Sequence, residues 1–167
     1  MEEDIVRKMG IRTLATRFKR ISDKISHSTR EMYRSLEMDI EPNWYLVLYL
    51  LQKHRSLSAM EIGAYLGFTH QSVLTMTSIM IKRGYLSSEK DTNDARRTLF
   101  SITEKSEKII PVLKEIWDIG EQIIQEAIEH DEELLSYLDR IEDHFNQQTF
   151  GNRILEKFNK KQQNENS

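Results

Sequence analysis

The chain reads LSAMEIGAYLGFTHQSVLTMTSIMIKRGYL from residue 57 to residue 86, a stretch with two helix starts and two helix stops. Ser58 and Glu61 have the spacing of a capping box, in which each side chain accepts a hydrogen bond from the backbone amide of the other residue. Gly67 can adopt the left-handed conformation that ends a helix. We therefore expect a short helix over residues 59–66.

The same signals recur directly downstream. Thr69 is the next N-cap, and the helix after it places Val73, Met76 and Met80 on one apolar face before Gly84 ends it. We expect this second helix over residues 70–83. Two short helices separated by about three residues around a glycine form a helix-turn-helix.

Two extended segments follow the second helix. They are separated by the polar, turn-forming sequence DTNDARR, which spans residues 91–97. A β-hairpin in this position is a wing, and we expect it over residues 85–102. Before the helix-turn-helix, Pro42 opens an apolar segment that predicts a buried helix over about residues 42–54.

Long amphipathic helices are expected on both sides of this winged lobe. Apolar residues recur at three- and four-residue steps near each end of the chain, which is the pattern of a heptad seam. The seam residues are Ile11, Leu14, Phe18 and Ile21 near the N-terminus, and Leu134, Leu138, Ile141 and Phe145 near the C-terminus. Such stripes pack on another helix in a monomeric bundle or in a dimer, and the similar seams at both ends favour a dimer.

The composition excludes several classes of protein. The 167 residues include no Cys, which rules out a disulfide scaffold, a thiolate metal site and a thiol switch. The longest apolar run, Trp44 to Leu51, has eight residues, whereas a membrane-spanning helix needs about 20. The acidic first residues do not resemble a signal peptide, and we expect a cytoplasmic protein. The histidines show no ligand-like spacing beyond His130 and His144, so we expect no metal and no cofactor.

The net charge of −3 conceals an asymmetry along the chain. Residues 5–34 hold nine Lys and Arg against two acidic residues, and residues 42–103 hold seven against four. Residues 104–144 hold four against thirteen. Binding to nucleic acid depends on local basic patches and not on the whole-chain charge, although solvated helix faces are the alternative explanation of these charges.

Three pieces of the sequence carry a family signature when they are taken in order. They are the first short helix at residues 57–63, the body and exit of the second helix from Val73 to Leu86, and the wing, where Asp91 is followed by Asp-x-Arg and a strand that closes in Thr-Glu-Lys. Together they resemble the MarR family of bacterial transcriptional regulators. The sequence departs from the family pattern at Leu74, where a polar residue is common, and at Ser106, where many members have Gly.

The resemblance implies a mainly α fold with a small β-wing, in which long helices flank a DNA-binding lobe. An N-terminal dimerisation helix would occupy residues 1–40, the winged helix-turn-helix residues 41–103, and C-terminal dimerisation helices residues 104–148. Apart from the resemblance, the residues of 149–167 themselves predict a short amphipathic piece and a disordered tail from Lys160 onward. The implied function is sequence-specific regulation by a homodimer on a pseudo-palindromic operator of double-stranded DNA.

The first set of expected DNA contacts lies on the second helix of the motif. A helix in the major groove presents its N-terminal residues and one exposed face to the base edges. The candidates are Thr69, His70, Gln71, Ser72, Thr75, Ser78, Lys82 and Arg83. Each could instead be an ordinary exposed helix residue, and Lys82 and Arg83 also complement the helix dipole.

The second set of expected contacts lies on the wing. Arg96 and Arg97 can reach the adjacent minor groove, whose negative potential attracts guanidinium groups. The resemblance implies that Asp94 orients the arginine through an ion pair. The alternative is an ordinary surface hairpin with a weak salt bridge.

The resemblance also implies a small aromatic or anionic effector, held between the dimer helices and the winged lobe. The corresponding walls would include Tyr33, Trp44, Tyr45 and Trp117, although these side chains could equally fill a core.

Two other classes of function were compared with this one. A winged-helix protein-interaction module without specific DNA binding would lack the wing arginines or carry an acidic recognition face, and this sequence has neither. An enzyme is not expected, because the sequence has no nucleophile elbow, phosphate-binding glycine loop or dinucleotide fingerprint.

Overall fold

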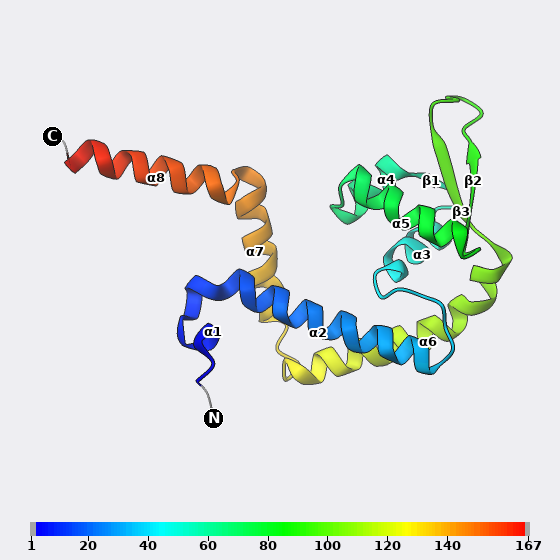
Figure 1. Ribbon diagram of the computed structural model, residues 1–167, viewed down its shortest axis with the longest axis horizontal. Coiled ribbons are helices and arrows are strands. Elements are labelled where there is room, and N and C mark those ends of the chain that lie inside the picture. Colours follow the sequence, from blue (N-terminus) through cyan, green and yellow to red (C-terminus); the bar gives the residue numbers. More distant parts are fainter. Residues whose placement is uncertain (1–2, 166–167) are drawn as a thin grey trace. The chain divides into compact units, whose positions relative to one another are not determined.

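The computed structural model describes residues 3–165 (Figure 1). The chain divides into two compact units, residues 1–114 and 115–167, and α6 runs across the boundary between them. In chain order the elements are α1 (Ile5–Lys8), the 3-10 turn η1 (Gly10–Thr13), α2 (Leu14–Ser35), α3 (Trp44–Lys53), β1 (Leu57–Ser58), α4 (Ala59–Leu66), α5 (His70–Lys82), β2 (Leu86–Lys90), β3 (Thr98–Ile102), α6 (Glu104–Ala127), α7 (Glu133–Gln147) and α8 (Phe150–Glu165).

The helix-turn-helix is formed by α4 and α5, and its ends follow the local signals of the sequence. The Ser58 amide donates to the Glu61 carboxylate at 2.8 Å, and the Glu61 amide donates to the Ser58 hydroxyl at 3.4 Å, so the capping box is present. Gly67 ends α4 with a φ of 66°. The hydroxyl of Thr69 accepts from the amide of Ser72 at 3.2 Å and begins α5.

The wing is part of a three-stranded antiparallel sheet with the strand order β1-β3-β2. The hairpin of β2 and β3 pairs Leu86 with Ile102 and Lys90 with Thr98. β1 has no signal in the sequence, and its two residues pair with Leu99 and Phe100 of β3. This short strand fixes the base of the wing directly to the residue that caps α4.

The core of the first unit is centred on α3. Its buried side chains include Trp44, Val47, Leu48 and Leu51, and α4, α5, β3 and α6 each contribute further buried apolar residues. α3 begins at Trp44 and not at Pro42, because Pro42 lies in the turn whose Glu41 carbonyl accepts the amide of Trp44 at 3.0 Å.

Side chains at the start of α6 donate hydrogen bonds to the backbone carbonyl groups that follow the end of α5. The Thr103 hydroxyl donates to the Gly84 carbonyl at 2.7 Å, and the Lys105 ammonium donates to the Arg83 carbonyl at 2.7 Å. Ser106 is fully buried, and its hydroxyl donates to the carbonyl of Tyr85. The serine that stands where the family commonly has glycine therefore has a hydrogen-bonding role, and it shares the Tyr85 carbonyl with the amide and hydroxyl of Thr103, each at 3.2 Å.

Gly63 lies where α4 approaches the turn before α5. A Cβ atom added there would lie 2.8 Å from the backbone carbonyl oxygen of Phe68, and that oxygen belongs to backbone that has little freedom to move. We expect Gly63→Ala to lower the free energy of unfolding by about 1–3 kcal/mol, as measured by urea denaturation.

The control is Gly120→Ala in α6, where the added Cβ would meet nothing within 4 Å. This change is expected to raise helix stability by about 0.5–1 kcal/mol, because Ala has the higher helix propensity. Equal effects of the two substitutions would show that the turn can move away from α4.

The terminal segments differ from the sequence-based expectation in two ways. Ile11 lies in the 3-10 turn η1 and not in the same helix as the other seam residues, since α2 begins only at Leu14. The expected disorder from Lys160 onward is wrong for residues 160–165, which continue α8. Two i,i+4 ion pairs, Lys160 with Glu156 at 2.6 Å and Lys161 with Glu165 at 3.7 Å, support this last part of the helix. Residues 166–167 of that tail, and residues 1–2, lie outside the described residues.

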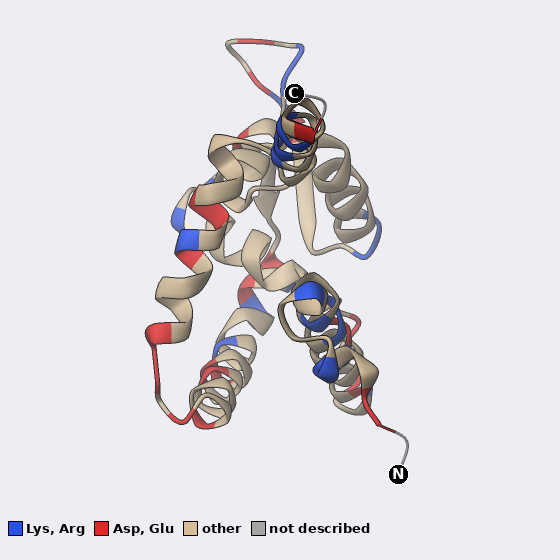
Figure 2. Ribbon diagram, turned by 90° about the vertical axis from the view of Figure 1, so that its left-hand side faces the viewer, with Lys and Arg blue, Asp and Glu red and all other residues tan. Residues whose placement is uncertain are grey.

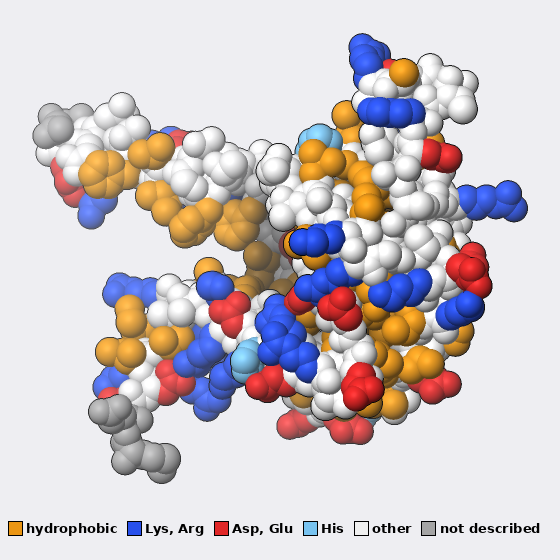
Figure 3. Space-filling model, turned by 45° about the vertical axis from the view of Figure 1, so that its right-hand side comes forward, with side chains coloured by type: hydrophobic (Ala, Val, Ile, Leu, Met, Phe, Trp, Pro, Cys, Tyr) orange, Lys and Arg blue, Asp and Glu red, His pale blue; other side chains and the backbone are white. Residues whose placement is uncertain are grey.

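Several helices expose apolar stripes. On α2 the exposed stripe consists of Phe18, Ile21 and Ile25. On α8 it consists of Phe150, Ile154, Leu155 and Phe158. Figure 3 shows apolar side chains along α8. Within residues 3–165, no helix has both the length and the apolar character needed to cross a membrane.

Candidate nucleic-acid interface

One face of α5 is polar and exposed. Val73, Met76, Thr77 and Met80 point into the core, and the opposite side of the helix is open to solvent. The exposed residues among the predicted contacts are Thr69, His70, Gln71, Ser72, Thr75, Ser78 and Lys82. The Thr69 hydroxyl also lies 2.8 Å from the Ser72 hydroxyl, and Thr75 donates to the Gln71 carbonyl at 2.9 Å, so each of these three hydroxyls keeps a hydrogen or a lone pair for a further hydrogen bond.

Arg83 differs from the other predicted contacts on this helix. Its guanidinium lies 2.8 Å from a carboxylate oxygen of Asp39 and 3.4 Å from one of Glu41. It also lies over the ring of Trp44, 5.2 Å from the centroid. Since two carboxylates and an aromatic face already hold this cation, we do not include Arg83 in the candidate interface.

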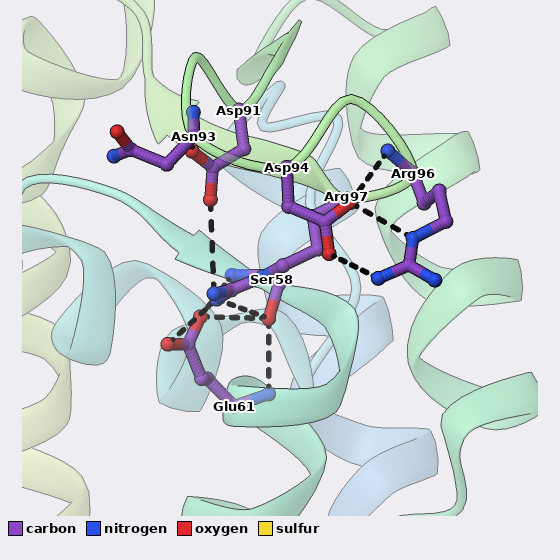
Figure 4. Close-up of polar contacts among 7 residues, drawn as sticks. All are labelled: Ser58, Glu61, Asp91, Asn93, Asp94, Arg96 and Arg97. Atoms are coloured by element: carbon purple, nitrogen blue, oxygen red, sulfur yellow. Dashed lines mark hydrogen bonds and ion pairs between the residues drawn. The ribbon is translucent and has the colours of Figure 1, made fainter.

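Arg96 lies in the loop of the wing and is held by Asp94. Nε of Arg96 donates to Oδ1 of Asp94 at 3.0 Å, and Nη2 donates to Oδ2 at 3.1 Å (Figure 4). These bonds lower the pKa of Asp94 and raise the pKa of Arg96. The side chain of Arg96 is nevertheless 91% exposed, so the guanidinium is oriented and still accessible.

Arg97, the next residue, extends in another direction. Its Nη2 lies 2.9 Å from Oε1 of Glu61 and 3.5 Å from the hydroxyl of Ser58, and its Nη1 lies 3.7 Å from Asp91 (Figure 4). From the sequence, the two arginines are expected to make equivalent contacts, and Glu61 is expected only to cap a helix. The partnership with Glu61 had no sequence signal, because it depends on how the wing folds back onto α4.

Ser58 has the largest influence on the ionisation of Glu61. The Ser58 hydroxyl and amide both donate to the Glu61 carboxylate, and the Arg97 guanidinium adds to their effect, so that the pKa of Glu61 falls to about 2. Glu61 is therefore ionised at neutral pH. The wing loop that carries Arg97 contains both acidic and basic residues (Figure 2).

The loop itself is closed by local hydrogen bonds. The Asp91 carboxylate accepts from the amide of Asn93 at 2.8 Å, and the Arg97 amide donates to the carbonyl of Asp94 at 2.8 Å. The Asp91 amide in turn donates to the carbonyl of Arg97 at 3.1 Å. These bonds fix the path of the loop between the two strands.

The four aromatic residues that we expected around a ligand have different surroundings. Tyr33 and Trp44 are buried in the first unit, Tyr45 is exposed, and Trp117 is half-buried in the second unit. Two surface depressions lie elsewhere, one along α2 from Ala15 to Lys24 and one beside α5 lined by Leu74, Thr77, Ser78, Ile81 and Phe100. The effector site stays a prediction. Among the residues that the structure describes, no group of His, Asp and Glu could hold a metal ion.

The chain is similar to known regulators in sequence profile and in fold. Residues 38–97 match the profile of the MarR family, whereas no curated protein matches the chain in sequence. The S. aureus MepR–DNA complex has 19% identity and a TM-score of 0.69, and the similarity covers 78% of this chain and 96% of that one.

Two further solved structures have the same fold. A MarR/EmrR family transcriptional regulator from Acinetobacter sp. ADP1 has 16% identity and a TM-score of 0.69 over 81% of this chain and 96% of that one. The PcaV transcriptional regulator from Streptomyces coelicolor, in complex with its natural ligand, has 18% identity and a TM-score of 0.62 over 78% of this chain and 94% of that one. The capped α4–α5 pair, the wing and the sequence match agree, and residues 38–97 match the MarR family and have the winged helix-turn-helix fold of its solved members.

Proposed function

We propose that this protein is a sequence-specific DNA-binding transcriptional regulator that acts in the cytoplasm. The observation that carries the proposal is the pair of exposed elements on one lobe, the polar face of α5 and the oriented guanidinium of Arg96. A helix of this kind suits the major groove, where Gln71 can bond the N6 and N7 atoms of adenine. A wing arginine suits the adjacent minor groove.

We further propose that two copies bind together. One winged helix reads only a few base pairs, and two-fold symmetry doubles that footprint. The apolar stripe of α2 and the apolar residues of α7 are exposed in the single chain, which supports their use between copies. The expected operator is pseudo-palindromic, with half-sites about 10 base pairs apart.

Modulation by a small molecule is a separate part of the proposal. PcaV was solved with its natural ligand, and its fold is similar to that of this chain. We propose that a small aromatic or anionic effector shifts this protein between conformations with different DNA affinity.

The experiment that tests DNA binding compares the wild type with Arg96→Ala. Fluorescence anisotropy would be measured at about 150 mM salt on an operator duplex selected from the DNA upstream of the gene, with a scrambled duplex beside it. The wild type is expected to prefer the operator, and Arg96→Ala to weaken that binding by about 1–3 kcal/mol.

The control variant is Lys114→Ala, which removes one exposed positive charge from α6 and is expected to leave operator binding nearly unchanged. Equally weak binding to both duplexes that does not respond to Arg96→Ala would contradict the proposal. That outcome would favour the alternative function, a winged-helix protein-interaction module.

A further inference from the structure

The wing contacts the helix-turn-helix at the N-terminus of α4. There, β1 pairs with β3 through Leu57 with Phe100 and Ser58 with Leu99. β1 contains only two residues, so its backbone pairing alone is a short attachment for a hairpin of five-residue strands. A side-chain contact in the same place therefore has a large influence on the orientation of the wing.

That side-chain contact is made by Arg97. Its guanidinium reaches from the end of the wing loop to Glu61 at 2.9 Å and Ser58 at 3.5 Å, both at the start of α4, while Asp91 at the other end of the loop lies 3.7 Å away (Figure 4). One cation thus joins both ends of the loop to the first turn of α4.

Glu61 is well suited to receive this cation. The amide of Ser58 donates to Oε2 of Glu61 at 2.8 Å and the hydroxyl of Ser58 donates to the same oxygen at 2.6 Å, which leaves Oε1 directed at Arg97. The pKa of Glu61, about 2, keeps the carboxylate charged at neutral pH. The capping box therefore fixes the position of the anion by contacts that do not involve the wing arginine.

We propose that Arg97 is a positioning residue, which through Glu61 and Asp91 holds the wing at a fixed angle to the helix-turn-helix and so sets where Arg96 meets DNA. The inference rests on the proposed DNA-binding function. α4 leads directly into α5, and the Arg97–Glu61 ion pair fixes the wing to α4, so the pair sets the separation between the major-groove helix and the minor-groove arginine. A mobile wing would have to lose conformational entropy when it binds DNA.

The decisive variant is Glu61→Gln. Gln also completes a capping box, so this change keeps the start of α4 and removes the ion pair with Arg97. If the only effect were on the overall electrostatic field, losing a negative charge from a DNA-binding lobe would strengthen DNA binding. The positioning role predicts the opposite sign, a loss of about fivefold to twentyfold in operator affinity at about 150 mM salt.

The arginine variants complete the comparison. Arg97→Ala is expected to weaken binding by a similar factor, and the double variant with Glu61→Gln to be no weaker than either single one. Arg96→Ala, in contrast, should lower the slope of log affinity against log salt by about 1, because it removes a cation that contacts DNA. Neither Arg97→Ala nor Glu61→Gln should change that slope. The matched control is Glu89→Gln on β2, an exposed carboxylate whose loss should leave affinity unchanged or slightly higher.

A second measurement uses the free protein. The chain has no cysteine, so Ala64→Cys on α4 and Thr92→Cys in the wing loop give two unique sites for spin labels. We expect a narrow distance distribution by pulsed electron paramagnetic resonance in the wild-type background and in Arg96→Ala. The distance distribution should broaden in Glu61→Gln and Arg97→Ala. In Arg97→Lys, which keeps the positive charge, the distribution should be narrower than in Arg97→Ala. Circular dichroism of each variant verifies that α4 and α5 are folded.

The outcomes separate this inference from the proposed function. If the wild type binds no DNA, the proposed function fails, and the distance distributions still decide whether the ion pair holds the wing. If the wild type binds its operator and Glu61→Gln binds equally well or better, the positioning role is wrong. If Arg97→Ala then lowers the salt slope as Arg96→Ala does, Arg97 is itself a DNA contact.

Discussion

Trp44→Ala is expected to lower the free energy of unfolding by about 3–5 kcal/mol, because it removes the largest fully buried side chain of the winged lobe. Trp44 is 1% exposed and lies edge-on to Tyr85, with ring centroids 5.4 Å apart. It also supports the guanidinium of Arg83. A loss of this size is a large part of the 5–15 kcal/mol that keeps most domains folded.

The measurement is urea denaturation followed by circular dichroism, since the substitution removes one of the two tryptophans that fluorescence would report. Tyr49→Ala, an exposed aromatic residue on the same helix, is the control, and its effect should stay within about 0.5 kcal/mol. If Trp44→Ala cost less than about 1 kcal/mol and changed the binding of an aromatic ligand, Trp44 would line an effector pocket and our assignment of it to the core would be wrong.

The helix-turn-helix could be predicted from the sequence because its boundaries depend on neighbouring residues. The capping box that begins α4 spans Ser58 to Glu61, and the cap of α5 spans Thr69 to Ser72. Gly67 ends α4 through its own backbone conformation. Each signal acts within about one helical turn, so the order of residues contains it in full.

The carboxylates that Arg83 and Arg97 bind could not be predicted from neighbouring residues in this way. Arg83 binds Glu41, which is 42 positions away in the chain. Arg97 binds Glu61, and α5 and β2 lie between these two residues in the chain. The sequence shows that cations and carboxylates are present, but only the tertiary fold shows which of them meet. The ion pair of Asp94 with a wing arginine was expected from the family resemblance, and the structure shows that its partner is Arg96, two residues away.

β1 was missed for a related reason. Two residues give no alternation of polar and apolar side chains, and Ser58 already had a complete role as a helix cap. The extended backbone that a cap residue adopts also suits pairing with a neighbouring strand, so Ser58 does both. Because Ser58 both caps α4 and pairs with β3, Glu61 lies within reach of Arg97.

Ile21→Asp is expected to have the largest effect on function. Ile21 is 52% exposed in the single chain and lies on the α2 stripe with Phe18 and Ile25. If this stripe forms the proposed dimer interface, a carboxylate there is desolvated without a partner, and the dimer dissociates. A monomer can occupy only one half-site, so operator affinity should fall by about 10²- to 10⁴-fold, the gain that linking two binding sites usually provides.

Thr16→Asp separates this effect from the simple addition of a negative charge. Thr16 is exposed on the side of α2 opposite the stripe, so its substitution adds the same charge without disturbing the interface. Sedimentation velocity should find a monomer for Ile21→Asp and a dimer for Thr16→Asp, and anisotropy on the operator should follow the same division. A dimeric Ile21→Asp that binds its operator normally would place the interface on other exposed apolar residues, such as those of α7 and α8. A monomeric Ile21→Asp with unchanged affinity would mean that one lobe recognises the DNA alone, and the proposed pseudo-palindromic operator would be wrong.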